Sequence, residues 1–261
     1  AEEHGIAVVQ PTKLNDGTFE AWLRDQQPDV CVLVAYGRIL KQPLLDVPPH
    51  GFINAHASLL PRHRGASPIQ TSILVGDEVT GVSIMRLDAG MDTGDVLLKE
   101  ETPILPDDTT TSLSERLAGI SAPALLRALE LIGSGQAVFT AQDPAQATEC
   151  RMFKKEDGQI RWAASAHDIH NLVRASIPWP VAHCLYKGGV CRIIKTEVIA
   201  KTGESTQPGT VVEVTKDRVV VATGEGCLAI IEIQMPGKRA MAVADFLRGQ
   251  SMRPGDRFED L

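Results

Sequence analysis

The sequence lacks any long apolar run. No stretch approaches the ~20 apolar residues that a membrane-spanning helix needs, which argues against a membrane protein. Internal repeats and low-complexity tracts are also absent, and an apolar content of 43% is enough to build a packed core. We therefore expect the 261 residues to form one large globular domain or two smaller ones.

Cysteine is scarce and irregularly spaced. The five cysteines include no C-x-x-C pair and their number is odd, which argues against a disulfide framework and against a zinc site. Such cysteine usage favours a reducing compartment, so we expect a cytoplasmic protein. The positions are Cys31, Cys150, Cys184, Cys191 and Cys227.

Basic residues are fewer than acidic ones, and the difference is confined to the first part of the chain. The net charge is −7, with 10 Lys and Arg against 20 Asp and Glu in residues 1–149 and 16 against 13 in residues 150–261. The back part is therefore the better candidate for contact with a polyanion, although ordinary solvated surface explains so small an excess equally well.

Strand and helix signals alternate through the first half of the chain. This alternation predicts an α/β fold whose sheet has a parallel portion. Residues 29–37 form a continuous apolar run, which suits a strand buried on both faces. The expected strands are 6–11, 29–37, 51–57, 81–87 and 95–101, and the expected helices are 19–27 and 68–74.

A longer helical stretch ends near Gly133. Ser112 and Glu115 match a capping box at its start, and Pro123 is expected to break it into two helices. The residues that follow have weak periodicity, so we interpret 136–154 as a linker between domains.

The sequence beyond this linker is rich in short β runs. A helix expected at 165–176 precedes them and another at 242–249 follows them. Several short strands separated by turns indicate a small barrel such as an OB-fold. The expected organisation is thus an α/β domain over 1–135 and a barrel domain over 155–261.

Two polar side chains, Asn54 and His56, stand in the expected strand 51–57. Residues i and i+2 of a strand share a face, so the amide and the imidazole project side by side. Both come late in the strand, and open α/β sheets bind ligands outside the carboxyl ends of their strands. Both groups can donate to an oxygen that becomes negative during addition to a carbonyl. A purely structural histidine is the alternative.

An acidic, glycine-rich loop separates the last two expected strands of this half. Asp88, Asp92 and Asp95 lie in it, but the loop resembles a calcium-binding EF-hand only superficially because the bidentate Glu is out of register. A carboxylate that orients or charges His56 is the more economical hypothesis, and turn-forming aspartates are the alternative.

The motif "NAHASLLPRHRGASPIQ" (54–70), with Asp92 in "GMDTGDVL" 36 residues after His56, resembles the 10-formyltetrahydrofolate-dependent formyltransferases. The stretches "FKKEDGQIRW" (153–162) and "VRASIPWP" (173–180) resemble the branch of that family that acts on methionyl-tRNA. The resemblance implies a Rossmann-like formyltransferase domain followed by an OB-like domain that contacts tRNA. It also implies that Asn54, His56 and Asp92 are the catalytic residues.

The resemblance implies further positions for the formyl donor, 10-formyltetrahydrofolate. The turn of Ser58, Leu59, Leu60 and Pro61 falls on the folate-contacting stretch, and its rigidity suggests a cis Leu60–Pro61 peptide bond. Arg38 and Leu40 fall on the loop beside the pterin pocket, and the backbone from Asp88 to Asp92 forms the opposite wall.

For the second substrate, initiator methionyl-tRNA, the resemblance and the charges suggest two places. Arg62 and Arg64 lie beside the reacting edge, and Lys238 and Arg239 occupy a turn of the barrel. An exposed basic turn without function is the alternative for the last two. We expect a monomer that uses no metal and binds no membrane.

The chain departs from the family at its start. The family begins with a strand, a glycine turn, a helix, a second strand and a basic loop, and none of these has a match here, so we expect part of the protein to precede Ala1. The open alternatives are a formyltransferase for glycinamide ribonucleotide or an amino sugar, a formyltetrahydrofolate hydrolase, and an inactive RNA-binding fragment.

Overall fold

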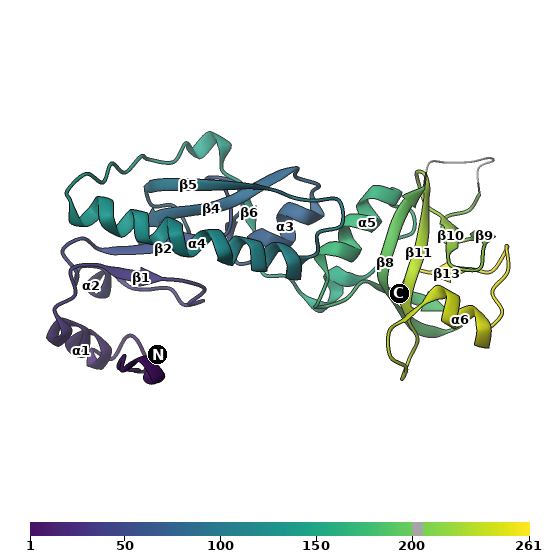
Figure 1. Ribbon diagram of the computed structural model, residues 1–261, viewed down its shortest axis with the longest axis horizontal. Helices are drawn as coiled ribbons and strands as arrows, with labels where there is room; N and C mark the ends of the chain where they lie inside the picture. The colour runs from purple at the N-terminus through teal and green to yellow at the C-terminus, as the bar shows by residue number, and fades with distance from the viewer. Residues whose placement is uncertain (200–205) are drawn as a thin grey trace. The chain divides into compact units, whose positions relative to one another are not determined.

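Residues 1–199 and 206–261 are described in this computed structural model, and they form two units. The first unit contains residues 1–65, 81–101 and 119–149, and the second contains residues 66–80, 102–118 and 150–261. Figure 1 labels the helices and strands.

A mixed sheet forms the centre of the first unit, in the strand order β1-β2-β4-β5. β1 pairs with β2 in parallel, and β2 pairs with β4 in antiparallel orientation. The parallel pair confirms the expected α/β class. The bounds are β1 (Cys31–Leu33), β2 (Phe52–His56), β4 (Val79–Arg86) and β5 (Val96–Pro103). A separate two-stranded sheet is formed by β3 (Arg64–Gly65) and β6 (Glu149–Cys150).

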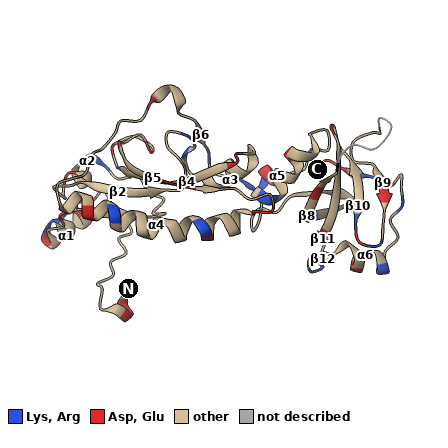
Figure 2. Cartoon of the chain, turned by 45° about the horizontal axis from the view of Figure 1, so that its top comes forward, with Lys and Arg blue, Asp and Glu red and all other residues tan. Residues whose placement is uncertain are grey.

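Helices cover parts of this sheet. The apolar spacing predicted for α1 (Thr18–Gln26) places Leu23 in a buried cluster with Leu44 of α2 (Gln42–Leu45) and with Phe52. The later turns of the long helix α4 (Thr110–Gly133) run along the sheet in Figures 1 and 2, and Arg127 in these turns forms an ion pair of 3.3 Å with Glu100 of β5. The remaining helical turns here are η1 (Glu2–His4) and η2 (Pro144–Gln146).

Two strand predictions were wrong. Residues 6–11 form no strand and are largely exposed, because an extended segment needs a neighbour for its backbone hydrogen bonds and no described strand pairs with it. Of residues 29–37 only Cys31–Leu33 is a strand, and Val32 is 42% exposed. That strand is not buried on both faces, because it lies at the end of the strand order given above.

Two predictions about α4 were also wrong. The helix continues through Pro123, and the carbonyl that loses its helical donor there belongs to exposed Gly119, where water can replace the donor. The capping box forms earlier than expected. The Ser112 N–H donates to Thr109 Oγ1 over 3.3 Å, and the Thr109 N–H donates to Ser112 Oγ over 3.0 Å.

A curled antiparallel sheet dominates the second unit. Its order is β13-β7-β8-β11-β10-β9, with β12 beside β11, and register shifts in β10 and β11 increase its curl. This half-barrel agrees with the expected OB-like domain. The strands are β7 (His183–Tyr186), β8 (Gly189–Ile199), β9 (Val211–Val214), β10 (Val219–Ala222), β11 (Cys227–Gln234), β12 (Met241–Ala242) and β13 (Phe258–Glu259).

The predicted helix at 165–176 packs on this sheet as α5 (Ala166–Ala175). Ser165 caps it by accepting a 3.0 Å hydrogen bond from the Asp168 N–H, and Ile169 and Val173 join the buried core. The other helices are α3 (Pro68–Leu74), η3 (Lys155–Gly158) and α6 (Val243–Gly249). No helix within the described residues is long and apolar enough to cross a membrane.

Asp108 is a buried carboxylate at the start of α4. Burial by itself raises the pKa of this carboxyl, but hydrogen bonds from Arg116, the Leu105 N–H and Ser112 outweigh it, so the pKa lies below its usual range. Arg116 holds both carboxylate oxygens. Asp108 is therefore ionised in the folded protein at neutral pH.

Candidate active site

Strand β2 presents Asn54 and His56 on one face, as their spacing predicts. Asn54 lies between its register partners Leu33 of β1 and Met85 of β4. Its side-chain amide is half-buried and makes no hydrogen bond within the described residues, so its N–H groups are available to a ligand. His56, at the end of the strand, is 6% exposed.

The His56 ring is held between two oxygens. Nε2 lies 2.9 Å from the His63 carbonyl oxygen, and since a carbonyl only accepts, Nε2 is the donor. Nδ1 lies 3.6 Å from Asp92 Oδ2. The expected approach of Asp92 to His56 is therefore confirmed, and Nδ1 is the ring nitrogen that faces the carboxylate.

The loop between β4 and β5 brings Asp92 to this position. Asp92 has a φ of 55°, a left-handed conformation that is uncommon outside glycine, although aspartate adopts it more often than most residues. Its Oδ2 accepts a 2.8 Å hydrogen bond from the Gly65 N–H. Gly65, with a φ of 117°, is itself in a conformation that favours glycine. The hydrogen bond from Gly65 of β3 and the backbone of the loop thus fix the Asp92 carboxylate beside the imidazole.

Asp88, in the same loop, behaves as a turn residue. Its Oδ1 accepts a 2.9 Å hydrogen bond from the Gly90 N–H and a 2.7 Å bond from the Thr93 hydroxyl. Among the described residues, no group of three or more His, Cys, Asp or Glu is arranged to hold a metal ion.

The amide of Asn54, the imidazole of His56 and the carboxylate of Asp92 form an arrangement that suits acyl transfer. Comparison with known proteins identifies the family. A model of the formyl transferase family matches residues 2–129, and one of the formyl transferase C-terminal domain matches 152–251. The methionyl-tRNA formyltransferase of Desulfotalea psychrophila is 44% identical over 249 residues, covering 95% of this chain and 77% of the relative. That of Acetivibrio thermocellus is 42% identical, covering 98% and 82%.

This chain belongs to the methionyl-tRNA formyltransferase family. The resemblance in the sequence motifs is thereby confirmed. The fold also matches HypX of Aquifex aeolicus in complex with tetrahydrofolic acid, with a TM-score of 0.64, 18% identity, and coverage of 93% of this chain and 43% of HypX. At that identity the likeness concerns the fold alone.

The turn expected to contact the formyl donor is rigidly held in this family member. Ser83 Oγ accepts a 3.0 Å hydrogen bond from the Leu60 N–H and donates to the Ser58 carbonyl over 2.7 Å. Ser58 Oγ donates to the Arg62 carbonyl over 2.6 Å. The Leu60–Pro61 peptide bond is cis, as predicted.

The other two candidate donor residues differ in their surroundings. Leu40 is buried in the cluster around Leu23 and Leu44. The Arg38 guanidinium lies on the exposed surface, where it donates to the carbonyls of Pro11 and Thr12 over 3.3 Å.

The candidate tRNA contacts also differ from one another. Arg62 is exposed, whereas Arg64 is half-buried and donates from Nε and Nη2 to Gln142 Oε1 over 3.0 and 2.8 Å. In the second unit, Lys238 and Arg239 are exposed in the turn before β12, and Figure 2 shows blue segments beside β12 and at the end of α6.

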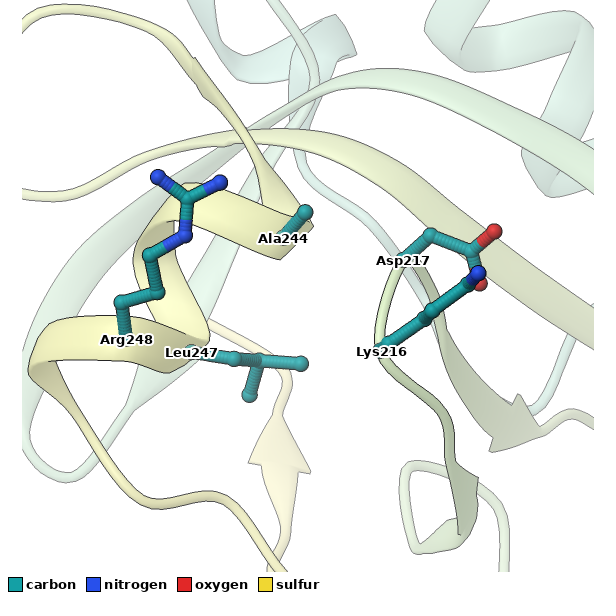
Figure 3. A pocket seen from close by; sticks show the side chains of 5 residues that line it. All are labelled: Lys216, Asp217, Ala244, Leu247 and Arg248. Carbon is teal, nitrogen blue, oxygen red and sulfur yellow. The ribbon is translucent and has the colours of Figure 1, made fainter.

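A pocket in the second unit had no signal in the sequence. It has a volume of about 470 Å³ and is lined by Lys216 and Asp217 on one side and by Ala244, Leu247 and Arg248 of α6 on the other (Figure 3). The two basic residues come from separate elements, so only the folded chain brings them to one opening.

Sequence reasoning also missed Gln142 and Thr148, which lie in the expected linker. Gln142 contacts the loop of Asp92, and Thr148 contacts the chain around His63. We call residues 140–148 the strap. Its weak periodicity hid these contacts, because single side-chain hydrogen bonds leave no repeating pattern in a sequence.

Proposed function

We propose that this protein transfers the formyl group of 10-formyltetrahydrofolate to the α-amino group of methionine on initiator tRNA. The observation that supports this most directly is the arrangement of Asn54, His56 and Asp92, in a chain that shares over 40% identity with methionyl-tRNA formyltransferases. We propose these three residues as the catalytic group.

In this mechanism the neutral amine of methionine attacks the formyl carbon. An α-amine with a pKa of ~7.7–8.0 has a sufficient neutral fraction at physiological pH. Asn54 and the Nδ1–H of His56 donate to the formyl oxygen as it gains negative charge. The bond from carbon to the folate nitrogen breaks as the new carbon–nitrogen bond forms.

Asp92 has two parts in this proposal. Its carboxylate lies 3.6 Å from Nδ1, where it faces the ring nitrogen and keeps the imidazole oriented. It also takes the proton from the attacking amine, directly or through a water, for delivery to the folate nitrogen that leaves. The His63 carbonyl, which accepts from Nε2, fixes the ring plane.

We propose that the formyl donor binds beside this group. We propose that the turn Ser58, Leu59, Leu60 and Pro61, which combines apolar side chains with a fixed backbone, forms one wall of its site. We further assign Arg38, Leu40 and the backbone from Asp88 to Asp92 to the same site.

For methionyl-tRNA we propose contacts with Arg62 and Arg64 near the reacting group and with Lys238 and Arg239 in the barrel. The positive balance of the second half of the chain supports the barrel contacts. We keep 1–135, 136–154 and 155–261 as catalytic domain, linker and tRNA-binding domain, a division supported by family matches that end at residue 129 and resume at 152. We also propose that the protein is a cytoplasmic monomer that does not bind membranes.

An acceptor competition tests the proposed function. Purified protein and 10-formyltetrahydrofolate are offered methionyl-tRNA, glycinamide ribonucleotide, an amino-sugar nucleotide, or water alone. We expect formyl-methionyl-tRNA as the main product. Preferential formylation of another amine, or release of formate without an acceptor, would assign the protein to one of the alternative activities, and no turnover at all would contradict an enzymatic role.

A further inference from the structure

The strap connects the two loops that support the candidate active site. At its start, Thr140 exchanges two 2.9 Å backbone hydrogen bonds with Val96 of β5. At its end, Thr148 donates its N–H to the Pro61 carbonyl, and its hydroxyl and carbonyl accept from the N–H groups of His63 and Arg64. Between these anchors stands Gln142.

The side-chain amide of Gln142 makes four hydrogen bonds, two through Oε1 and two through Nε2. Oε1 accepts from Arg64 Nε and Nη2 over 3.0 and 2.8 Å. Nε2 donates to the carbonyls of Asp92 and Gly94 over 2.8 and 2.7 Å. One half-buried amide therefore joins the chain after β2 to the loop that carries the catalytic carboxylate.

The backbone at Asp92 requires such support. Its φ of 55° costs free energy in a residue that has a Cβ, and such conformations persist only where the surroundings hold them. The Gln142 Nε2 bonds hold the carbonyls on both sides of Thr93. Without them, the loop can relax and carry the Asp92 carboxylate away from His56.

We propose that Gln142 is a positioning residue for formyl transfer, which sets the Asp92 carboxylate by fastening its loop to Arg64. The proposal rests on the proposed function of Asp92, but its structural part can be measured without turnover. Gln142 touches no reacting atom, so its loss should lower kcat and leave KM for the formyl donor near that of the wild type. Because Gln142 Oε1 also holds Arg64, a proposed tRNA contact, KM for methionyl-tRNA can change as well in a variant that releases Arg64.

Three variants separate the possible causes of a defect. Gln142→Ala removes all four hydrogen bonds. Gln142→Glu keeps an acceptor for Arg64 but replaces the donor to Asp92 and Gly94 with a carboxylate oxygen that their carbonyls repel, so it releases the loop while keeping the contact with Arg64. Gln146→Ala is the matched control, because this glutamine lies in the same strap, is exposed, and donates its side-chain amide only to Asp143, over 2.8 Å.

Two measurements decide the proposal. In steady-state formylation of methionyl-tRNA, we expect kcat to fall about 10- to 100-fold for Gln142→Ala and Gln142→Glu, since a displacement of about 1 Å in a catalytic group costs up to about 100-fold. By NMR hydrogen exchange, the Gly65 amide, which donates to Asp92 Oδ2, should exchange at least about tenfold faster in both variants. Gln146→Ala should match the wild type in both.

The outcomes separate this proposal from the function it rests on. Wild-type kcat and wild-type Gly65 exchange in Gln142→Glu would overturn the positioning role, as would a defect shared equally by Gln146→Ala. If Gln142→Ala does not fold, Gln142→Glu carries the test. If the wild type forms no formyl-methionyl-tRNA, the proposed function fails, and the Gly65 comparison alone then decides whether Gln142 holds the loop.

Discussion

Replacing Gly94 by Ala should displace the loop that carries Asp92. A Cβ on Gly94 would lie 1.9 Å from the Arg86 carbonyl oxygen and 3.0 Å from its carbonyl carbon. These are backbone atoms of β4, and the Arg86 N–H is bonded to the Asp95 carbonyl over 2.8 Å, so they cannot rotate away as a side chain would. The loop itself has to move.

The size of the movement follows from these distances. Real Cβ contacts essentially never fall below 3.0 Å, so the separation of 1.9 Å must open by about 1 Å or more at a position two residues from Asp92. Overpacking of this kind lowers the free energy of unfolding by about 1–3 kcal/mol. A shift of about 1 Å in a catalytic group reduces the rate by up to about 100-fold.

Steady-state formylation and urea denaturation measure both effects. We expect Gly94→Ala to stay folded, with kcat reduced about 10- to 100-fold. Gly119→Ala is the control: its Cβ meets no atom within 4 Å on an exposed face of α4, so it should keep full activity and gain about 0.5–1 kcal/mol of stability. Wild-type kcat in a folded Gly94→Ala protein would refute the link between loop position and rate.

Three further outcomes are expected. Asn54→Ala should lower kcat by about 100- to 1,000-fold, with the affinity for tRNA almost intact, as single-turnover and binding assays would show. Neutralising Lys238 and Arg239 together should raise KM for methionyl-tRNA and reduce the salt dependence of binding by ~1.4–1.8 log units per log unit of salt, whereas equal slopes would remove this turn from the tRNA interface. Asp108→Asn should lower the free energy of unfolding by about 1.5–3 kcal/mol at pH 7. The pKa of Asp108 is lower in the folded than in the unfolded protein, so its ionised carboxylate stabilises the fold above the unfolded-state pKa. This stabilisation is lost as pH falls through the folded-state pKa. The free energies of unfolding of the wild type and Asp108→Asn, measured in urea, should therefore converge in acid.

Local patterns predicted the parts of the fold that depend on near neighbours in the sequence. The shared face of Asn54 and His56 follows from the two-residue period of a strand, and the helix expected at 165–176 follows from the spacing of its apolar residues. The extended segment at 6–11 failed because strand formation depends on a partner that the segment itself does not encode. The closeness of Asp92 to His56 was a hypothesis from carboxylate and imidazole chemistry that the family resemblance then implied, since no periodicity relates a strand to a loop 36 residues later.

The hydrogen bonds that hold the loops of the candidate site could not be predicted from the sequence for the same reason. Gln142 and Thr148 act through single hydrogen bonds to residues about 50 to 85 positions away in sequence, within a stretch that has no helix or strand period. Only the three-dimensional arrangement shows that a segment interpreted as a linker contacts the loop that carries Asp92.

The strap also restricts which changes of chain length the protein can accept. Gln142 and Thr148 are six residues apart and both act as anchors, with the capped turn η2 between them. Gln142 bonds to the loop of Asp92 and to Arg64, and Thr148 bonds to the chain from Pro61 to Arg64. An inserted or deleted residue within 143–147 would shift one anchor relative to the other, although this stretch is mostly exposed and would ordinarily be judged a tolerant surface loop. Substitutions there that keep the length, by contrast, leave both anchors in register. In this stretch, therefore, length is under stronger constraint than residue identity.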